Sequence, residues 1–308
     1  MDDKIKNTSK PGVAYYHLPG LFEFYGLYRM FLPLFYHHRE YFYNWCAIGS
    51  IYGALGDCIW GGGRTSFGVQ DPEDVMDLMR EYGISARLTF SNSLLREEHL
   101  ADIKCNALCK LFENSGGAQN GVIVHSDLLL RYLESRYPGL YFVSSTTKVL
   151  TEFPQLQAEL NRDDFRYVVP DFRLNKEFEQ LNNLPQPQKD KVEFLCNECC
   201  WFGCKDRKCC YENVSRKTLA KPAPTTAAQP LAHRKGIAFQ KQWTTPVLLA
   251  SRIFKISICP WAFPTSKLRG RGLGSALILE FLLYYMTKPE YQLRVREEIY
   301  LNNMLDLF

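Results

Sequence analysis

The stretch Gly121-Val-Ile-Val-His-Ser-Asp-Leu-Leu-Leu-Arg-Tyr-Leu133 indicates how this chain folds. Residues 121–124 form a short apolar run bounded by polar residues, which is typical of a buried strand. Residues 125–127 are a polar loop, and the apolar side chains of 128–133 then recur at helical spacing. A second apolar run, 140–143, follows, and it ends in serines and threonines. The stretch therefore predicts a strand–loop–helix–strand unit.

The same alternation recurs on both sides of this unit, about every 20 to 30 residues, as expected for a parallel sheet with crossover helices. More than four such units favour a closed barrel over an open sheet. The sequence therefore predicts an α/β fold of the (β/α)8 TIM type. Further strands are expected at residues 47–52, 84–90, 167–169, 191–195 and 253–258, and late helices at 275–286 and 289–300.

Three segments depart from this alternation. Residues 1–14 are expected to be a disordered lead-in, and the aromatic-rich segment up to residue 45 predicts a helical N-terminal extension punctuated by Pro19 and Pro33. Residues 46–308 are then expected to form a single barrel domain. Within it, residues 218–235 are rich in Pro, Ala and Thr and predict a mobile insertion.

Composition limits the class of protein. The chain has 308 residues, of which 46% are hydrophobic and 23% charged, with a net charge of +4, which is too small to indicate nucleic-acid binding by itself. No apolar run reaches the roughly 18 residues of a membrane span, and the first ten residues lack the apolar core of a secretory signal. We expect a cytoplasmic protein whose eleven cysteines are reduced thiols or metal ligands rather than disulfides.

Cysteines are concentrated in Phe194-Leu-Cys-Asn-Glu-Cys-Cys-Trp-Phe-Gly-Cys-Lys-Asp-Arg-Lys-Cys-Cys-Tyr211, directly after a predicted strand. Thiolates two to four residues apart allow one loop to wrap a soft or borderline metal ion. A disulfide knot or buried, inert thiols are the alternatives. The spacing favours a metal or iron–sulfur site.

Polar residues at the predicted strand ends define a candidate pocket, because the carboxyl ends of barrel strands share one face. His125, Asp171 and Glu198 are the candidates for proton transfer, although each carboxylate could equally be a cap. Arg64 is the candidate anchor for an anionic or carbonyl group, unless it pairs with Asp57 or Asp71 at the surface. The other predicted substrate-binding residues are Tyr52, Asn92 and Ser145.

Three stretches give the chain a resemblance to the collagenase-like peptidase family U-32, whose catalytic type is unknown. The first is the unit at 121–133 with Leu140-Tyr-Phe-Val-Ser-Ser-Thr-Thr-Lys148, and the second is Asn197-Glu198 with the cysteines that follow. The third, Lys267-Leu-Arg-Gly-Arg-Gly272, resembles a turn in which the family has Glu where this chain has Arg269. Cys210 stands where relatives often have His.

The resemblance implies a TIM-type barrel and, in some relatives, a [4Fe–4S] cluster. On that basis Cys200, Cys204, Cys210 and Cys259 are the expected ligands, with Cys196, Cys199 and Cys209 in reserve. Relatives are described as peptidases, or as iron–sulfur proteins that hydroxylate RNA bases or a quinone precursor without oxygen. The substrate implied is thus RNA, a peptide or a small aromatic molecule, and a redox partner or a paired homologous subunit is also implied.

Two classes of function remain open at this point. One is an iron–sulfur enzyme that modifies a substrate held above the cluster, with a peptidase (a hydrolase) as its alternative. The other is a barrel with a structural zinc that acts as a binding or scaffold protein, because four thiolates suit either metal centre. No HExxH or Gly-x-Ser-x-Gly motif supports a standard hydrolase.

Overall fold

The computed structural model describes residues 12–56, 58–62, 70–198, 200–219 and 263–302. Eight parallel strands form one sheet, in the order β6-β5-β4-β3-β2-β1-β8-β7. The edge strands β6 and β7 approach each other through a parallel bridge between Val168 and Val192, where the Val168 N–H donates to the Lys191 carbonyl at 2.8 Å. The sheet is therefore a nearly closed (β/α)8 barrel of the TIM type, as the sequence predicted. The strands are β1 (Ala14–Pro19), β2 (Cys46–Gly53), β3 (Ser85–Phe90), β4 (Gly121–Val124), β5 (Tyr141–Ser144), β6 (Tyr167–Val168), β7 (Glu193–Leu195) and β8 (Thr265–Lys267).

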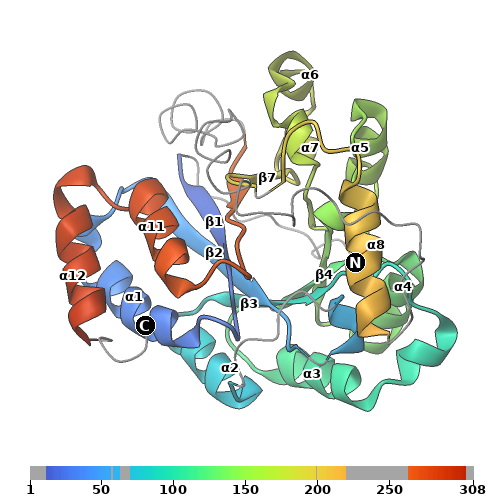
Figure 1. Ribbon diagram of the computed structural model, residues 1–308, viewed down its shortest axis with the longest axis horizontal. Helices are drawn as coiled ribbons and strands as arrows, with labels where there is room; N and C mark the ends of the chain where they lie inside the picture. The colour runs from blue at the N-terminus through green and yellow to red at the C-terminus, as the bar shows by residue number, and fades with distance from the viewer. Residues whose placement is uncertain (1–11, 57, 63–69, 199, 220–262, 303–308) are drawn as a thin grey trace.

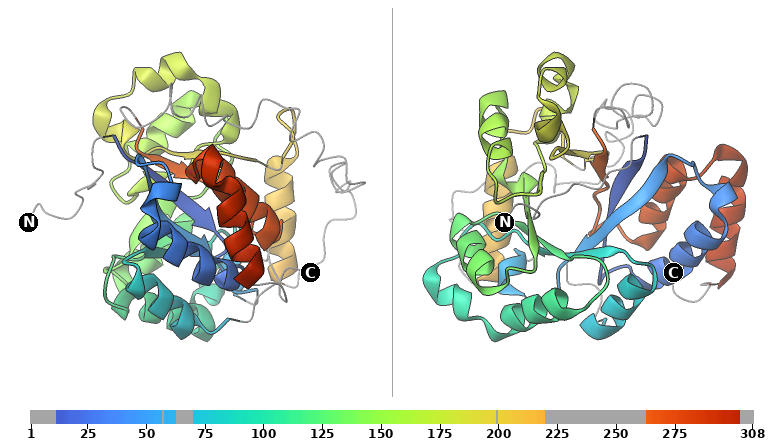
Figure 2. Two further views of the ribbon diagram at one scale, coloured as in Figure 1. Left: turned by 90° about the vertical axis from the view of Figure 1, so that its left-hand side faces the viewer. Right: turned by 180° about the vertical axis from the view of Figure 1, so that it is seen from behind.

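Helices surround the strands (Figure 1). The C-terminal pair α11 and α12 packs with α1 on one side of the barrel, and the three lie together in every view (Figure 2). Among the described residues, no helix is both long and apolar enough to cross a membrane. The helices are α1 (Tyr25–His37), α2 (Pro72–Glu81), α3 (Ile103–Asn114), α4 (Asp127–Arg136), α5 (Phe153–Leu160), α6 (Phe178–Asn182), α7 (Gln186–Lys189), α8 (Arg207–Thr218), α11 (Ser275–Met286) and α12 (Gln292–Asn302). Short 3-10 helices include η2 (Ile59–Gly61), η3 (Glu97–Ala101), η4 (Thr146–Lys148) and η5 (Phe172–Lys176).

The first strand comes earlier in the chain than expected. Residues 14–19, assigned from sequence to an extension, form β1, which lies between β2 and β8 in the sheet. The segment that follows does contain a helix, α1, with Pro33 inside it. The short strand β8 contains only Thr265, Ser266 and Lys267, and Lys267 is also the first residue of the stretch expected to form a turn. The predicted strand at 253–258 and the predicted insertion at 218–235 lie wholly or almost wholly outside the described residues.

An ionic network occupies the interior of the barrel. We call His17, Arg87, Glu193 and Lys267 the interior network. The Glu193 carboxylate accepts hydrogen bonds from Arg87 Nη1 at 2.5 Å and Lys267 Nζ at 3.0 Å, and His17 Nε2 lies 3.4 Å from it. All four residues are buried. One carboxylate thus joins β7 to β1, β3 and β8.

The charges within this network set its protonation. Burial alone would raise the pKa of Glu193, but the charges of Arg87, His17 and Lys267 hold it below its ordinary value. Burial lowers the pKa of Lys267 to about 8, although the Glu193 carboxylate opposes this shift. Burial, assisted by the charge of Arg87, also lowers the pKa of His17. Near neutral pH, Glu193 is therefore the anion that compensates two buried cations.

An apolar layer lies next to the interior network, with Lys267 Nζ 3.9 Å from the centre of the Tyr52 ring. Its members are the buried side chains of Tyr52, Ile123, Tyr141, Val143, Val169, Phe172 and Leu195. The partly buried Cys200 packs against this layer. A second, larger core fills the space between the sheet and the surrounding helices. The barrel interior is thus filled with side chains, as in other TIM-type barrels.

Replacing Glu193 by Gln should destabilise the fold strongly. The amide preserves the shape of the side chain but removes the charge that compensates Arg87 and Lys267, and breaking a buried ion pair from one side costs about 3–5 kcal/mol. Urea denaturation would measure this loss. Asp77→Asn is the control, because Asp77 pairs with Arg80 at the exposed surface of α2, where ion pairs contribute little. Equal stability of the two variants would contradict the role assigned to Glu193.

Candidate active site at the barrel mouth

The loops after β4, β5, β6, β7 and β8 converge at one end of the barrel, because parallel strands present their carboxyl ends on the same face. Each loop contributes polar side chains there. His125 follows β4, Ser145 follows β5, and Asp171 comes shortly after β6. Glu198 comes shortly after β7, and Arg269 comes shortly after β8. The mouth is completed by Arg207, the first residue of α8.

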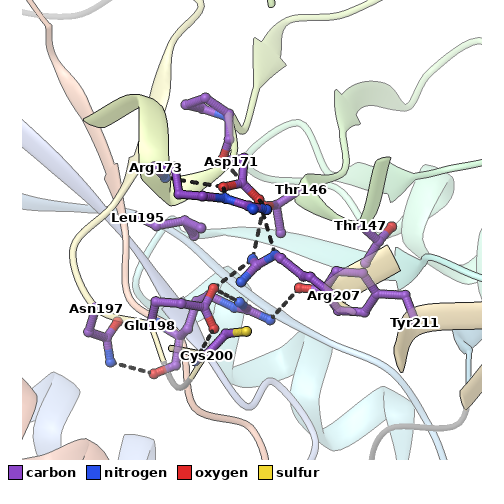
Figure 3. Close-up of polar contacts among 12 residues, drawn as sticks. Thr146, Thr147, Asp171, Arg173, Leu195, Asn197, Glu198, Cys200, Arg207 and Tyr211 are labelled. Atoms are coloured by element: carbon purple, nitrogen blue, oxygen red, sulfur yellow. Dashed lines mark hydrogen bonds and ion pairs between the residues drawn. The ribbon is translucent and has the colours of Figure 1, made fainter. Parts of the chain in front are cut away.

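Carboxylates and guanidinium groups alternate across this mouth (Figure 3). Asp171 accepts a hydrogen bond from Arg173 Nε at 2.6 Å, and its other oxygen lies 3.2 Å from Arg207 Nε. Arg207 Nη2 donates to Glu198 Oε2 at 2.6 Å, and Arg269 also donates to that oxygen. We call these five residues the mouth network. Because both carboxylates are buried and bound by arginines, they act here as anions that position cations.

Arg207 is the central member of the mouth network. Its side chain is only 3% exposed, and its guanidinium carbon lies 4.7 Å from the centre of the Phe172 ring and 5.3 Å from that of Tyr211. Its Nη1 is buried and has no hydrogen-bond partner among the described residues. Buried donors in proteins are nearly always satisfied. A carbonyl or anionic oxygen of a ligand is the kind of group that would satisfy this one.

The start of the cysteine loop is fastened to the mouth network at two points. The Cys200 N–H donates to Glu198 Oε1 at 3.2 Å, and Arg173 Nη1 donates to the Cys204 carbonyl at 3.2 Å. Burial raises the pKa of Cys200 to about 11, although the positive charge of Arg207 opposes this shift. The side chain of Cys204 interacts with that of Cys200 and contributes to raising its pKa. Without a metal, Cys200 is therefore a protonated thiol near neutral pH.

The described thiols do not by themselves complete a metal site. Among the described residues, no group of three His, Cys, Asp or Glu side chains is arranged to hold a metal ion. Cys196 is buried directly after β7, whereas Cys209 is exposed on α8, where its sulfur accepts from Asn213 at 3.6 Å. Cys199 and Cys259 lie outside the described residues. The expected set of Cys200, Cys204, Cys210 and Cys259 therefore stays a prediction.

A second polar group lies at the ends of β4 and β5. His125 Nδ1 lies 2.8 Å from Thr147 Oγ1, which lies 2.9 Å from Ser145 Oγ. Burial, with a smaller contribution from the charge of Lys148, lowers the pKa of His125 to about 4. The imidazole is therefore neutral at pH 7. Arg207 Nη2 donates to Thr146 Oγ1 at 3.5 Å, so the hydroxyl-bearing segment from Ser145 to Thr147 adjoins the mouth network.

The residues predicted from sequence fall into three sets. His125, Ser145, Asp171 and Glu198 lie at the mouth, as the strand-end argument indicated. Tyr52 lies instead in the apolar layer, where its hydroxyl donates to the Leu268 carbonyl at 2.5 Å. Asn92 is fully buried and bridges two loop segments, because its amide donates to the Ile59 carbonyl and accepts from the Leu94 N–H. Arg64 and its alternative partner Asp57 lie outside the described residues.

The strand-end argument did not identify the three arginines of the mouth network. Arg207 belongs to a helix after the cysteine loop, and Arg173 lies within η5. Arg269 is the third, and it binds Glu198. Its sequence signal was the Arg at a position where the resemblance implies Glu.

Comparisons with known proteins identify the fold. No family model matches the sequence, and no curated protein matches it. Among solved structures, the chain is similar to "The Structure of the U32 Peptidase Mk0906", with a TM-score of 0.51 and 12% sequence identity. The match covers 86% of this chain and 95% of that one. The expected resemblance to the U-32 peptidases is thus confirmed at the level of the fold, and this chain is a TIM-type barrel built like a U32 peptidase.

Proposed function

We propose that this chain is an enzyme whose substrate binds at the carboxyl-end mouth of the barrel, with Arg207 as its anchor. The observation that carries the proposal is the buried Nη1 of Arg207, which has no hydrogen-bond partner in the described part of the chain, on a guanidinium held between two carboxylates and two aromatic rings. A rigid, desolvated guanidinium is suited to an anionic or carbonyl oxygen. The mouth of the barrel is also where TIM-type enzymes place their chemistry.

For the reaction, we propose modification of the substrate beside a metal centre in the cysteine loop. A [4Fe–4S] cluster would supply electron transfer at the mouth, and oxygen-independent hydroxylation of an RNA base or small aromatic molecule is the reaction that the family resemblance implies. The support in this chain is the Cys200–Cys204 thiol pair beside Arg207. Among the described residues no group of three side chains is arranged to hold a metal ion, so the proposed set of Cys200, Cys204, Cys210 and Cys259 depends on Cys259, which lies outside them. A structural zinc in the same loop is the alternative.

Metal content tests this proposal. Anaerobically purified protein should be brown, with a broad visible band and bound iron and sulfide, whereas a structural zinc would leave it colourless. Cys200→Ser and Cys204→Ser should each lose most of the bound metal. Cys46→Ser is the matched control, because Cys46 is a buried thiol that donates to the Tyr43 carbonyl instead. Wild-type protein that retains neither iron nor zinc would overturn the metal proposal.

Peptide hydrolysis is the second candidate, and a separate observation favours it. A hydroxyl hydrogen-bonded to a neutral imidazole is the arrangement that activates a Ser or Thr nucleophile. Thr147 and His125 have this geometry, at 2.8 Å. In this reading His125 takes the proton of Thr147 as its oxygen attacks a peptide carbonyl. The similar solved structure is also titled a peptidase.

Cleavage of denatured protein substrates tests this second candidate. Fluorescent casein and gelatin should be cut by the wild type, and Thr147→Val should lose at least about 100-fold in rate, because valine keeps the shape but removes the nucleophile. Thr218→Val is the control, since its hydroxyl only donates to the Val214 carbonyl within α8. Full cleavage by Thr147→Val, or no cleavage by the wild type, would exclude Thr147 as a nucleophile for these substrates.

Acid sensitivity tests whether His125 is neutral. Its folded-state pKa of about 4 lies below the unfolded value of about 6.5, so the unfolded chain binds more protons between these values. The free energy of unfolding should therefore fall as the pH drops from 6.5 toward 4. His125→Gln lacks this titration. Urea denaturation at pH 7 and pH 4.5 should show the wild type losing up to about 3 kcal/mol more than the variant. Equal losses would mean that His125 is charged or solvated.

A further inference from the structure

Two cysteines that are not part of the mouth network, Cys58 and Cys105, face each other in the core between the sheet and the surrounding helices. Cys58 precedes η2 in the loop after β2, and Cys105 lies in the first turn of α3. Their sulfur atoms are 2.6 Å apart, and both side chains are buried. This separation is shorter than a van der Waals contact between two sulfur atoms and close to the bond length of a disulfide, about 2.0 Å.

The backbone holds both cysteines in place independently of their sulfur atoms. On the Cys58 side, the Gly61 N–H donates to the Cys58 carbonyl at 2.9 Å, and the Trp60 indole donates to the His99 carbonyl of η3 at 2.7 Å. On the other side, the Cys105 N–H donates to Asp102, which caps α3, at 2.8 Å. The two thiols are therefore brought together by the fold itself.

We propose that Cys58 and Cys105 form a disulfide that joins the loop after β2 to helix α3. In the reaction, a low-molecular-weight disulfide such as glutathione disulfide is reduced to two thiols. The two protein sulfurs lose two electrons and two protons to it and form one S–S bond. Exchange requires a thiolate. The hydrogen bond with Cys58, together with burial, raises the pKa of Cys105, so the thiolate is disfavoured in the folded protein and we expect the bond to form during folding.

This bond lies apart from the proposed metal site. The cysteine loop after β7 is bound to the mouth network, whereas Cys58 and Cys105 pack among apolar side chains between the sheet and its helices. The pair therefore accounts for two of the eleven cysteines without drawing on the expected metal ligands. It also gives the chain a covalent link across a long loop, which favours the folded state by constraining the unfolded one.

Refolding in a glutathione redox buffer tests the disulfide. The unfolded, reduced protein would be refolded with glutathione disulfide, its remaining thiols blocked with N-ethylmaleimide, and its peptides analysed by mass spectrometry. We expect a cross-linked peptide containing Cys58 and Cys105, lighter by two hydrogens than the sum of its parts. The oxidised protein should also melt several degrees above the reduced protein.

Variants separate this pair from its neighbours. Cys58→Ser should abolish the redox dependence of the melting temperature, whereas Cys109→Ser should keep it, although Cys109 is also buried, one turn further along α3. The proposal is overturned if Cys58 and Cys105 of the wild type are both alkylated after refolding, or if Cys58 is found linked to Cys109. The peptide analysis of the wild type decides the question even if a variant fails to fold.

Discussion

The carboxylate of Glu193 is the interaction on which this barrel depends. It is fully buried, and it compensates Arg87 and Lys267, which come from two other strands. An uncompensated charge in such a place costs several kcal/mol, so the strands that carry these groups are held in one register relative to each other. The strand β7 is only three residues long. Through Glu193 it therefore stabilises the closed barrel by ion pairs as well as by its backbone hydrogen bonds.

The same strands that hold the interior network also position the mouth. Side chains two residues apart on a strand point to the same face. On β8 and its extension, Lys267 belongs to the interior network and Arg269 to the mouth network, while Leu268 between them is buried in the core beneath the helices. Fixing Lys267 against Glu193 thus also directs Arg269 toward Glu198. The charges of each ionic network are compensated within that network: Glu193 by Arg87 and Lys267, and the two mouth carboxylates by arginines.

The sequence predicted the strands that read as apolar runs, including β3 and β7, and missed β1 and β8, which carry His17 and Lys267 of the interior network. Residues 121–124 were predicted as a strand with both ends correct, because β4 is buried on both faces. The strand β8 is entirely polar: Thr265 donates to the Val192 carbonyl and Lys267 to Glu193, and on β1 His17 lies 3.4 Å from the same carboxylate. At the mouth, the rule of strand ends found Asp171 and Glu198 but not Arg207, which binds both, because a contact between a strand end and a distant helix leaves no local pattern.

The position of Arg207 bears on which chemistry the mouth serves. A hydrolase built on Thr147 and His125 would need the guanidinium only to polarise a carbonyl, and the neighbouring thiols would have no part in it. A thiolate centre, in contrast, gains from a buried cation, because the positive charge of Arg207 acts to lower the raised pKa of Cys200. Two carboxylates then hold that cation in place, and one of them, Glu198, also binds the backbone of the cysteine loop. Three of the five charged groups beside the two thiols are buried, namely Asp171, Glu198 and Arg207, and a cation held in this way is what the proposed metal-thiolate centre would use.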